Sequence, residues 1–277
     1  MKKLWGKITV ITDDRLYDVI LGKLSLMFNV DGVHEEKISK TRTKLTVYTK
    51  DIKKLPVSNL IEYDPAIETR WKKYFKPKRV GEKIVIKPKW EKYKAKAGDV
   101  VVNINPGTAF GTGLHGTTRG VIISLQKILD EIKNKKGLSL LDAGTGSGIL
   151  AITAHKLGIK DITAVDSDIE AVAIAKENVV LNSIRMDGIK IKHNGIEKQN
   201  GTYNIVLANI VSGVLIAQRR RISSLIKPGG YVILSGILRT EANKVKRSFG
   251  EIKGLNYIRA VNMDEWTTFT IQKKGRP

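Results

Sequence analysis

The stretch SLLDAGTGSG, residues 139–148, is an apolar run that leads into a turn with three glycines. Apolar residues resume at Ile149 and continue to Leu157, in a pattern typical of a helix. Glycine lets the backbone adopt positive φ angles and approach a ligand closely, and the start of a helix offers free N–H groups. The stretch therefore predicts a buried strand, a glycine-rich turn and a helix, the arrangement that opens a nucleotide-type pocket.

The acid Asp166 follows a second apolar run and stands 20 residues after Gly146. This is the offset at which a carboxylate meets the hydroxyl groups of a ribose. A glycine-rich turn can also be no more than a turn, but the matched carboxylate favours a ligand site. We therefore expect Gly144, Gly146 and Asp166 to bind a nucleotide-like cofactor.

The spacing of the glycines separates the classes of cofactor. The dinucleotide fingerprint G-x-G-x-x-G requires a third glycine at residue 149, where this chain has isoleucine. The third glycine is Gly148 instead, and Asp142 stands two residues before the first, which gives D-x-G-x-G-x-G. This pattern resembles the first motif of S-adenosylmethionine-dependent methyltransferases, whose cofactor has no pyrophosphate.

Strand and helix patterns alternate through the C-terminal half of the chain. Such alternation predicts an α/β fold with a doubly wound, Rossmann-like sheet and a ligand crevice at the carboxyl ends of its strands. Gly144, Asp166 and Asn209 all stand at such ends. After residue 166 we predict helices at 169–182 and from 213 to 227, and strands at 189–191, 203–208, 231–234, 257–261 and 266–273, the last two as a hairpin.

Composition limits the class of protein. The chain has 277 residues, of which 42% are hydrophobic, enough for one large domain or for a medium domain with a small one. It has no cysteine, which excludes disulfides, thiolate metal sites and thiol nucleophiles. Lys7, Asp13 and Asp14 interrupt the apolar core that a signal peptide needs. We expect a cytoplasmic protein that does not enter a membrane.

The chain is strongly basic, with 49 Lys and Arg against 27 Asp and Glu and a net charge of +22. This balance attracts polyanions and says nothing about the fold. A ribosome, free RNA or simply a surface of solvated lysines would each account for it, so contact with nucleic acid stays open.

Residues 1–55 predict a small α+β unit without a catalytic pattern. We expect a strand at 4–12, a helix that Asp13 or Asp14 caps and that runs to about Phe28, and a strand at 44–49. The expected role of this unit is to dock a partner or to act as a lid.

Residues 56–97 are predicted as a basic connecting region. Between residues 70 and 96 there are 12 Lys and Arg against two acids, interleaved with the aromatic residues Trp71, Tyr74, Phe75, Trp90 and Tyr93. Rings among amines can form a nucleic-acid surface. We favour the alternative, in which the apolar side chains at 71, 75, 80 and 84 pack onto the next domain while the lysines are solvated.

The segment 105–118 is a second glycine-rich loop, whose backbone can close over a ligand. Phe110 can stack on an adenine or on the alkyl stem of a substrate, or simply fill the loop. His115 is a candidate general base, but a single histidine in a glycine loop is more often structural. Thr117 or Thr118 can cap the helix predicted from 119 to about 132.

Five sequence blocks stand out along the chain: WKKYFKPKRVGEKIVIKPKW (71–90), PGTAFGTGLHGTT (106–118), LLDAGTGSGILAI (140–152), LANI (207–210) and IKPGGYVILSGIL (226–238). Together they resemble one family, the methyltransferases of ribosomal protein L11. They occur in the family's order over roughly residues 70–240, and PGTAFGTG is the most distinctive. The first 55 residues match only in being a short α+β unit before a linker.

The resemblance implies three parts: a substrate-recognition domain at 1–55, a linker at 56–97 and a domain that binds S-adenosylmethionine at 98–277. It implies methylation of lysine side chains and α-amino groups of that ribosomal protein, free or on the ribosome, by a monomer. Contact with rRNA would run through the basic linker. Matched by motif, cofactor contacts fall at Thr118, Gly144, Asp166 and Asn209. The chain departs from the family at Gly116, where proline is usual, and in its short, basic N-terminal region.

Methyl transfer from a sulfonium is an in-line displacement that orientation can accelerate without a metal. Asn209 and Phe110 are the expected orienting residues, and no base is identified. The four histidines, at 34, 115, 155 and 193, have no metal-ligand spacing.

Two other functions remain as alternatives. An RNA base methyltransferase would suit the charge, but the sequence N-I-V-S at 209–212 lacks the prolines and the aromatic residue that hold a flipped base. A non-catalytic ribosome-binding protein with a vestigial cofactor fold would not need the intact glycines and Asp166.

Overall fold

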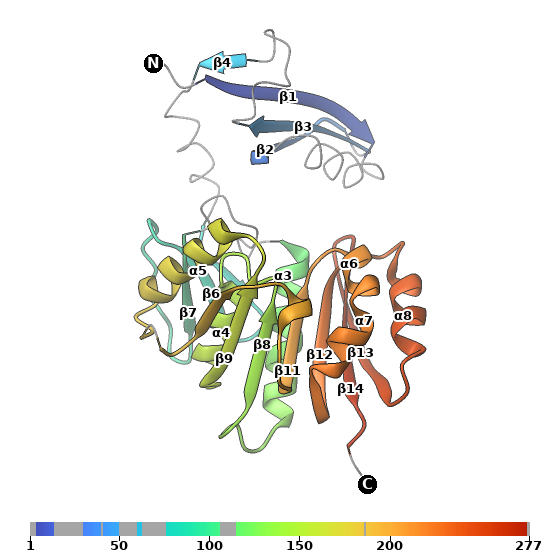
Figure 1. Cartoon of the computed structure of the whole chain (residues 1–277). Helices are drawn as coiled ribbons and strands as arrows, with labels where there is room; N and C mark the ends of the chain where they lie inside the picture. Colours follow the sequence, from blue (N-terminus) through green and yellow to red (C-terminus); the bar gives the residue numbers. More distant parts are fainter. Residues whose placement is uncertain are drawn as a thin grey trace. The chain divides into compact units, whose positions relative to one another are not determined.

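The structure, a computed structural model, describes residues 4–13, 30–39, 41–49, 60–62, 76–105, 115–185 and 187–275. The chain divides into two compact units, Met1–Lys76 and Pro77–Pro277 (Figure 1). None of the helices in these described ranges is both long enough and apolar enough to cross a membrane.

The first unit contains a four-stranded antiparallel sheet in the order β2-β3-β1-β4. The strands are β1 (Leu4–Asp13), β2 (Val30–Lys37), β3 (Arg42–Thr49) and β4 (Leu60–Glu62). Leu45 and Val47 alternate along β3 and are fully buried, as their apolar character predicts. The strands predicted at 4–12 and 44–49 are therefore confirmed. Beyond Asp13, which ends β1, the predicted helix lies outside the described residues.

The second unit begins with a three-stranded sheet that the sequence did not predict. Its strands are β5 (Lys78–Val80), β6 (Ile84–Pro88) and β7 (Val100–Ile104), with β5 and β6 antiparallel and β6 and β7 parallel. Val80 and Ile84 are buried, as expected for apolar side chains that pack onto the next domain, whereas the expected packing of Trp71 and Phe75 lies outside the described residues. The structure thus differs from the predicted linker, because residues 77–97 belong to the second unit.

The main sheet of the second unit has seven strands in the order β10-β9-β8-β11-β12-β14-β13. The parallel strands are β8 (Ser139–Ala143), β9 (Asp161–Asp166), β10 (Lys190–His193), β11 (Tyr203–Asn209) and β12 (Ile226–Leu238), and β13 (Leu255–Met263) and β14 (Trp266–Lys273) form the antiparallel hairpin. The strand order reverses between β8 and β11, so the sheet is doubly wound as predicted.

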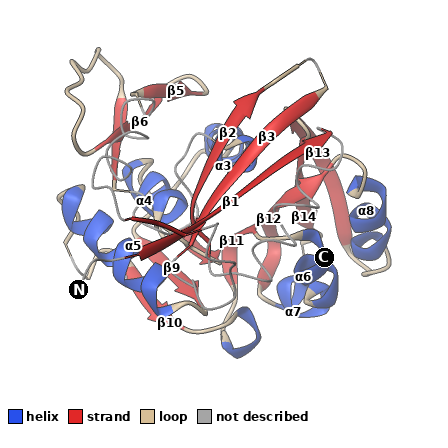
Figure 2. Ribbon diagram, turned by 90° about the horizontal axis from the view of Figure 1, so that it is seen from above, coloured by secondary structure: helices blue, strands red, loops and turns tan. Residues whose placement is uncertain are grey.

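Helices cover both faces of this sheet. Figure 2 shows α3 (Gly116–Glu131), α4 (Ile149–Lys156) and α5 (Ile169–Leu181) on one face, and α6 (Ser212–Ala217), α7 (Arg219–Ser224) and α8 (Ala242–Gly250) on the other. The α6–α8 face packs on a core that includes Val206, Val232, Leu234 and Phe249. The predicted helices at 119–132 and 169–182 are confirmed within a few residues.

Two local predictions were wrong. A single helix was expected from 213 to 227, but α6 and α7 are separate, and the strand expected from 231 already begins at Ile226, as β12. Gly229 has a φ of 78°, and a Cβ on Gly230 would lie 2.8 Å from the carbonyl oxygen of Asn204. The K-P-G-G turn therefore lets the chain run irregularly beside β11, where the strand register shifts between Tyr203 and Ile205.

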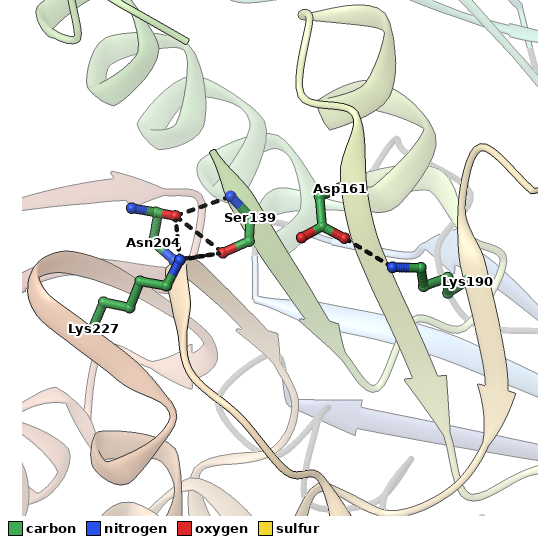
Figure 3. A network of polar contacts seen from close by, with 5 residues as sticks. All are labelled: Ser139, Asp161, Lys190, Asn204 and Lys227. Atoms are coloured by element: carbon green, nitrogen blue, oxygen red, sulfur yellow. Dashed lines mark hydrogen bonds and ion pairs between the residues drawn. The ribbon is translucent and has the colours of Figure 1, made fainter. Parts of the chain in front are cut away.

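Polar contacts fix the amino ends of the central strands (Figure 3). The Oδ1 of Asn204 accepts hydrogen bonds from the N–H and the hydroxyl of Ser139, both at 3.0 Å, and from the Lys227 ammonium at 3.1 Å. Beside them Lys190 pairs with Asp161 at 3.1 Å. These contacts join the starts of β8, β11 and β12, and those of β9 and β10. Because structural contacts occupy the amino ends of the strands, the opposite edge, at their carboxyl ends, is available for a site.

Candidate functional site

The glycine turn after β8 is held against the end of β9. The N–H groups of Gly144 and Thr145 donate to the carbonyl of Val165 at 2.9 and 3.0 Å. Gly144, Gly146 and Gly148 have φ angles of 74°, 53° and 79°, which favour glycine. The predicted strand, turn and helix are all confirmed.

Asp166 faces this turn from the end of β9. Its Oδ2 accepts a hydrogen bond from the N–H of Gly146 at 2.8 Å, and its Oδ1 accepts one from the N–H of Asp168 at 3.0 Å. Asp168 in turn caps α5 by accepting from the N–H of Glu170. The carboxylate is half-buried, so it is held in place and still has lone pairs for other donors.

Asp142, beneath the turn, is a second acid with an unusual environment. It is fully buried, and its Oδ2 accepts from the Thr145 hydroxyl at 2.6 Å and from the N–H of Ala151 at 3.2 Å. The pKa of Asp142 is raised to about 6, mainly by burial and to a lesser extent by the charge of Asp166, and the two hydrogen bonds act against this rise. Asp142 Oδ1 has no hydrogen-bond partner among the described residues.

Asn209 ends β11 at the same edge of the sheet. Its neighbour Ile210 packs onto the glycine turn, because a Cβ on Gly144 would lie 2.5 Å from Ile210 Cγ2. In the β11–β12 pairing Asn209 lies opposite Ser235. A Cβ on Gly236 would collide with the carbonyl oxygen of Ile210. Only glycine at this position therefore allows β12 to approach the turn after β11 this closely.

Thr118 is brought to the same place by α3. The Ser235 hydroxyl donates to the carbonyl of Thr117 at 3.1 Å, which fixes the first turn of α3 over β12. Thr118 is fully buried, and its hydroxyl has no hydrogen-bond partner in the described part of the chain. The structure thus links the surroundings of Thr118, Gly144, Gly146, Asp166 and Asn209 through direct contacts.

Most of the glycine-rich loop before α3 lies outside the described residues. Phe110 lies outside the described residues, so its role stays a prediction. His115, and not Thr117 or Thr118, is the N-cap of α3, because its Nδ1 accepts from the N–H of Thr117. Its ring also packs on Trp266 with centroids 4.9 Å apart. His115 therefore has a structural role, as the N-cap of α3 and as a packing partner of Trp266.

The matching family model and several curated relatives name one family. The model of the family "Ribosomal protein L11 methyltransferase (PrmA)" matches residues 14–274. A ribosomal protein L11 methyltransferase of Geotalea daltonii is 35% identical over 95% of this chain and 86% of its own length. One of Geotalea uraniireducens is 41% identical over 71% of this chain and 64% of its own length. This chain belongs to the ribosomal protein L11 methyltransferase family.

A solved structure of the same family gives the same result. The ribosomal protein L11 methylase of Lactobacillus delbrueckii subsp. bulgaricus has 29% identity and a TM-score of 0.65, and the match covers 72% of this chain and all of that one. The fold class predicted from the sequence, a Rossmann-like class I methyltransferase domain, is thereby confirmed.

The residues at this edge fit S-adenosylmethionine, the methyl donor of the family. The cofactor is a cation with a ribose diol, and the edge has the half-buried carboxylate of Asp166 and the deeper carboxyl of Asp142. The Thr118 hydroxyl is buried without a partner among the described residues, and Gly144 leaves no room for a side chain. In the same ranges no group of three His, Asp or Glu side chains could hold a metal ion.

Proposed function

We propose that this protein transfers methyl groups from S-adenosylmethionine to lysine side chains and α-amino groups of ribosomal protein L11. The observation that carries the proposal is the gathering of five motif residues at one sheet edge in a chain that belongs to this family along nearly its whole length. In this proposal residues 1–55 recognise the substrate. The enzyme acts as a monomer in the cytoplasm, on the protein either free or on the ribosome.

Each site residue has a role in this proposal. The bound cofactor supplies a methyl group on a positively charged sulfur. Asp166 accepts hydrogen bonds from the ribose hydroxyls, and the backbone at Gly144 and Gly146 approaches the cofactor where a side chain would obstruct it. Thr118 donates its free hydroxyl to the cofactor. Asn209 orients the cofactor or the incoming amine.

Catalysis in this site depends on orientation. The amine must arrive neutral and in line with the bond that breaks, and holding the two reactants in this geometry can lower the barrier by about 7–11 kcal/mol. Phe110 is proposed to help hold the alkyl stem of the lysine or the adenine. The proton of the lysine leaves to solvent before transfer.

The direct test uses purified L11 that lacks methyl groups. After incubation with the enzyme and S-adenosylmethionine, mass spectrometry of L11 peptides should find added methyl groups on lysine side chains and on the α-amino group. Methyl groups on other side chains would correct the target chemistry. An unmodified L11, together with cofactor binding by the enzyme, would contradict the proposed substrate.

Contact with rRNA is a separate part of the proposal and rests on the segment between β5 and β7. Four exposed lysines of this segment have no ion pair with the described residues: Lys89, Lys92, Lys94 and Lys96. Trp90 and Tyr93 are half-buried, and the Tyr93 hydroxyl donates to Asp99 at 2.7 Å. This favours lysine contacts with phosphates over stacking of bases on the rings.

A further inference from the structure

Strand β7 is an edge strand of the three-stranded sheet. It pairs with β6 on one side, and the carbonyl of Ile104 accepts from the N–H of Lys89 on that side. Asn103, within β7, and Asn105, directly after its end, have N–H and C=O groups that point to the other side. Such edge groups need partners when they are shielded from water.

Two asparagines, in the last turn of α5 and at its C-cap, provide these partners. Asn182 Oδ1 accepts from the N–H of Asn103 at 2.9 Å, and its Nδ2 donates to the carbonyl of the same residue at 2.6 Å. Asn178 bonds Asn105 in the same way: its Oδ1 accepts from the N–H of Asn105 at 2.8 Å, and its Nδ2 donates to the carbonyl of Asn105 at 3.0 Å. Asn178 and Asn182 are four helical residues apart, a rise of about 6 Å, and Asn103 and Asn105 are two extended residues apart, a rise of about 6.6 Å. The two spacings match, so each asparagine of the helix can bond one of these two residues.

Asn178 makes one contact that distinguishes it from Asn182. Its Nδ2 also donates to the carbonyl of Ser147, in the glycine turn, at 2.8 Å. One turn earlier on α5, Ala175 packs on the same turn, where a Cβ on Gly148 would lie 3.1 Å from its own Cβ. The second hydrogen bond from Asn182 goes instead to the carbonyl of Asn178, within α5, at 2.8 Å.

We propose that Asn178 is a positioning residue for cofactor binding, acting through the peptide of Ser147. Its side chain is fully buried, and one carboxamide fixes both the end of β7 and the peptide that joins Ser147 to Gly148 in the glycine turn. Because the N–H of Gly146 is hydrogen-bonded to Asp166, a shift of Ser147 would reach the carboxylate that faces the ribose. The inference rests on the proposed role of the glycine turn in binding S-adenosylmethionine.

The test compares Asn178→Asp with Asn182→Asp in the full-length chain. Each substitution keeps the acceptor, and each replaces an NH₂ group that donates to two carbonyls with an oxygen that repels them. The two variants therefore lose the same number of hydrogen bonds, and only one of them affects the glycine turn. We expect Asn178→Asp to weaken S-adenosylmethionine binding about tenfold more than Asn182→Asp in calorimetric titrations, while the two lower the unfolding midpoint similarly.

A second readout is the pH dependence of the same affinity. A buried carboxyl has a raised pKa and, once protonated, can donate one hydrogen bond. The affinity of Asn178→Asp relative to wild type should therefore recover as the pH falls, whereas the ratio for Asn182→Asp should not change. If the aspartates do not fold, Asn178→Ser and Asn182→Ser serve as the pair.

Three outcomes decide the matter. Selective loss of affinity in the residue 178 variant supports the positioning role. Equal affinities in the two variants would show that Asn178 only stabilises the fold, and would overturn the inference while leaving the proposed function intact. Failure of the wild-type protein to bind S-adenosylmethionine would overturn the proposed function and this inference together.

Discussion

At the scale of single residues, β9 has an aspartate at each end. Asp166 faces the glycine turn, whereas Asp161 pairs with Lys190 at the opposite edge of the sheet. The two substitutions Asp166→Asn and Asp161→Asn are therefore matched in strand and chemistry. We expect Asp166→Asn to raise the dissociation constant for S-adenosylmethionine by about tenfold to a hundredfold, because hydrogen bonds to a charged group contribute about 1.5–3 kcal/mol.

Calorimetric titration of both variants measures this effect. Asp161→Asn should bind the cofactor like the wild type, since its ion pair is exposed and such pairs add little to stability. Unchanged affinity in Asp166→Asn would remove this residue from the site.

The raised pKa of Asp142 predicts that the free energy of unfolding depends on pH. Burial raises its pKa from 3.8 to about 6, so between those values the folded protein binds more protons than the unfolded chain. Its contribution to the free energy of unfolding is therefore greatest below pH 4 and is lost as the pH rises through 6. At about 1.4 kcal/mol for each pKa unit, the loss is of the order of 3 kcal/mol.

Urea titrations of wild type and Asp142→Asn at several pH values measure this loss. Asparagine cannot ionise, so the disadvantage of the variant relative to wild type should shrink as the pH rises from 4 to 7. A difference in unfolding free energy that does not vary with pH would show that Asp142 ionises normally in the folded protein.

At the scale of elements, the approach of β12 to the turn after β11 depends on one glycine. Gly236 and Gly254 both have positive φ angles, 81° and 84°. A Cβ on Gly236 would collide with the Ile210 backbone, whereas nothing lies within 4 Å of a Cβ on Gly254. Alanine at either position costs about 1–2 kcal/mol for the left-handed backbone.

Only Gly236→Ala should also displace Asn209 and Ile210. We expect it to weaken S-adenosylmethionine binding at least tenfold, while Gly254→Ala keeps the wild-type affinity and reduces only stability. Titration calorimetry combined with thermal unfolding separates the two effects. Wild-type affinity in a folded Gly236→Ala variant would show that this turn does not contribute to the cofactor site.

The sequence predicted elements well where one apolar run corresponds to one strand. Residues 139–141 and 203–208 lie in β8 and β11, both buried in the centre of the sheet. It failed at 226–230, because an irregular strand with proline and two glycines has the composition of a loop. The role of Asn178 was also beyond prediction, since its partners Asn105 and Ser147 are 73 and 31 residues away and only the fold brings them together.

At the scale of the whole molecule, the net charge of +22 predicts a salt-dependent affinity for rRNA. Replacement of Lys89, Lys92 and Lys94 by glutamine should reduce the slope of log K against log salt by about 0.7–0.9 for each phosphate that a lysine no longer neutralises. Filter binding to rRNA fragments between low and physiological salt measures this slope. A slope equal to that of the wild type would show that this segment does not bind the RNA.

The fate of a labelled methyl group distinguishes the proposed protein substrate from RNA. Undermethylated ribosomes are incubated with methyl-labelled S-adenosylmethionine and wild-type enzyme, with Asp166→Asn and Asp161→Asn in parallel, and RNA is then separated from protein. We predict label in a single ribosomal protein, L11, at wild-type levels with Asp161→Asn and much reduced with Asp166→Asn. Label in the RNA fraction, or no label in either fraction from an enzyme that binds the cofactor, would contradict the proposed function.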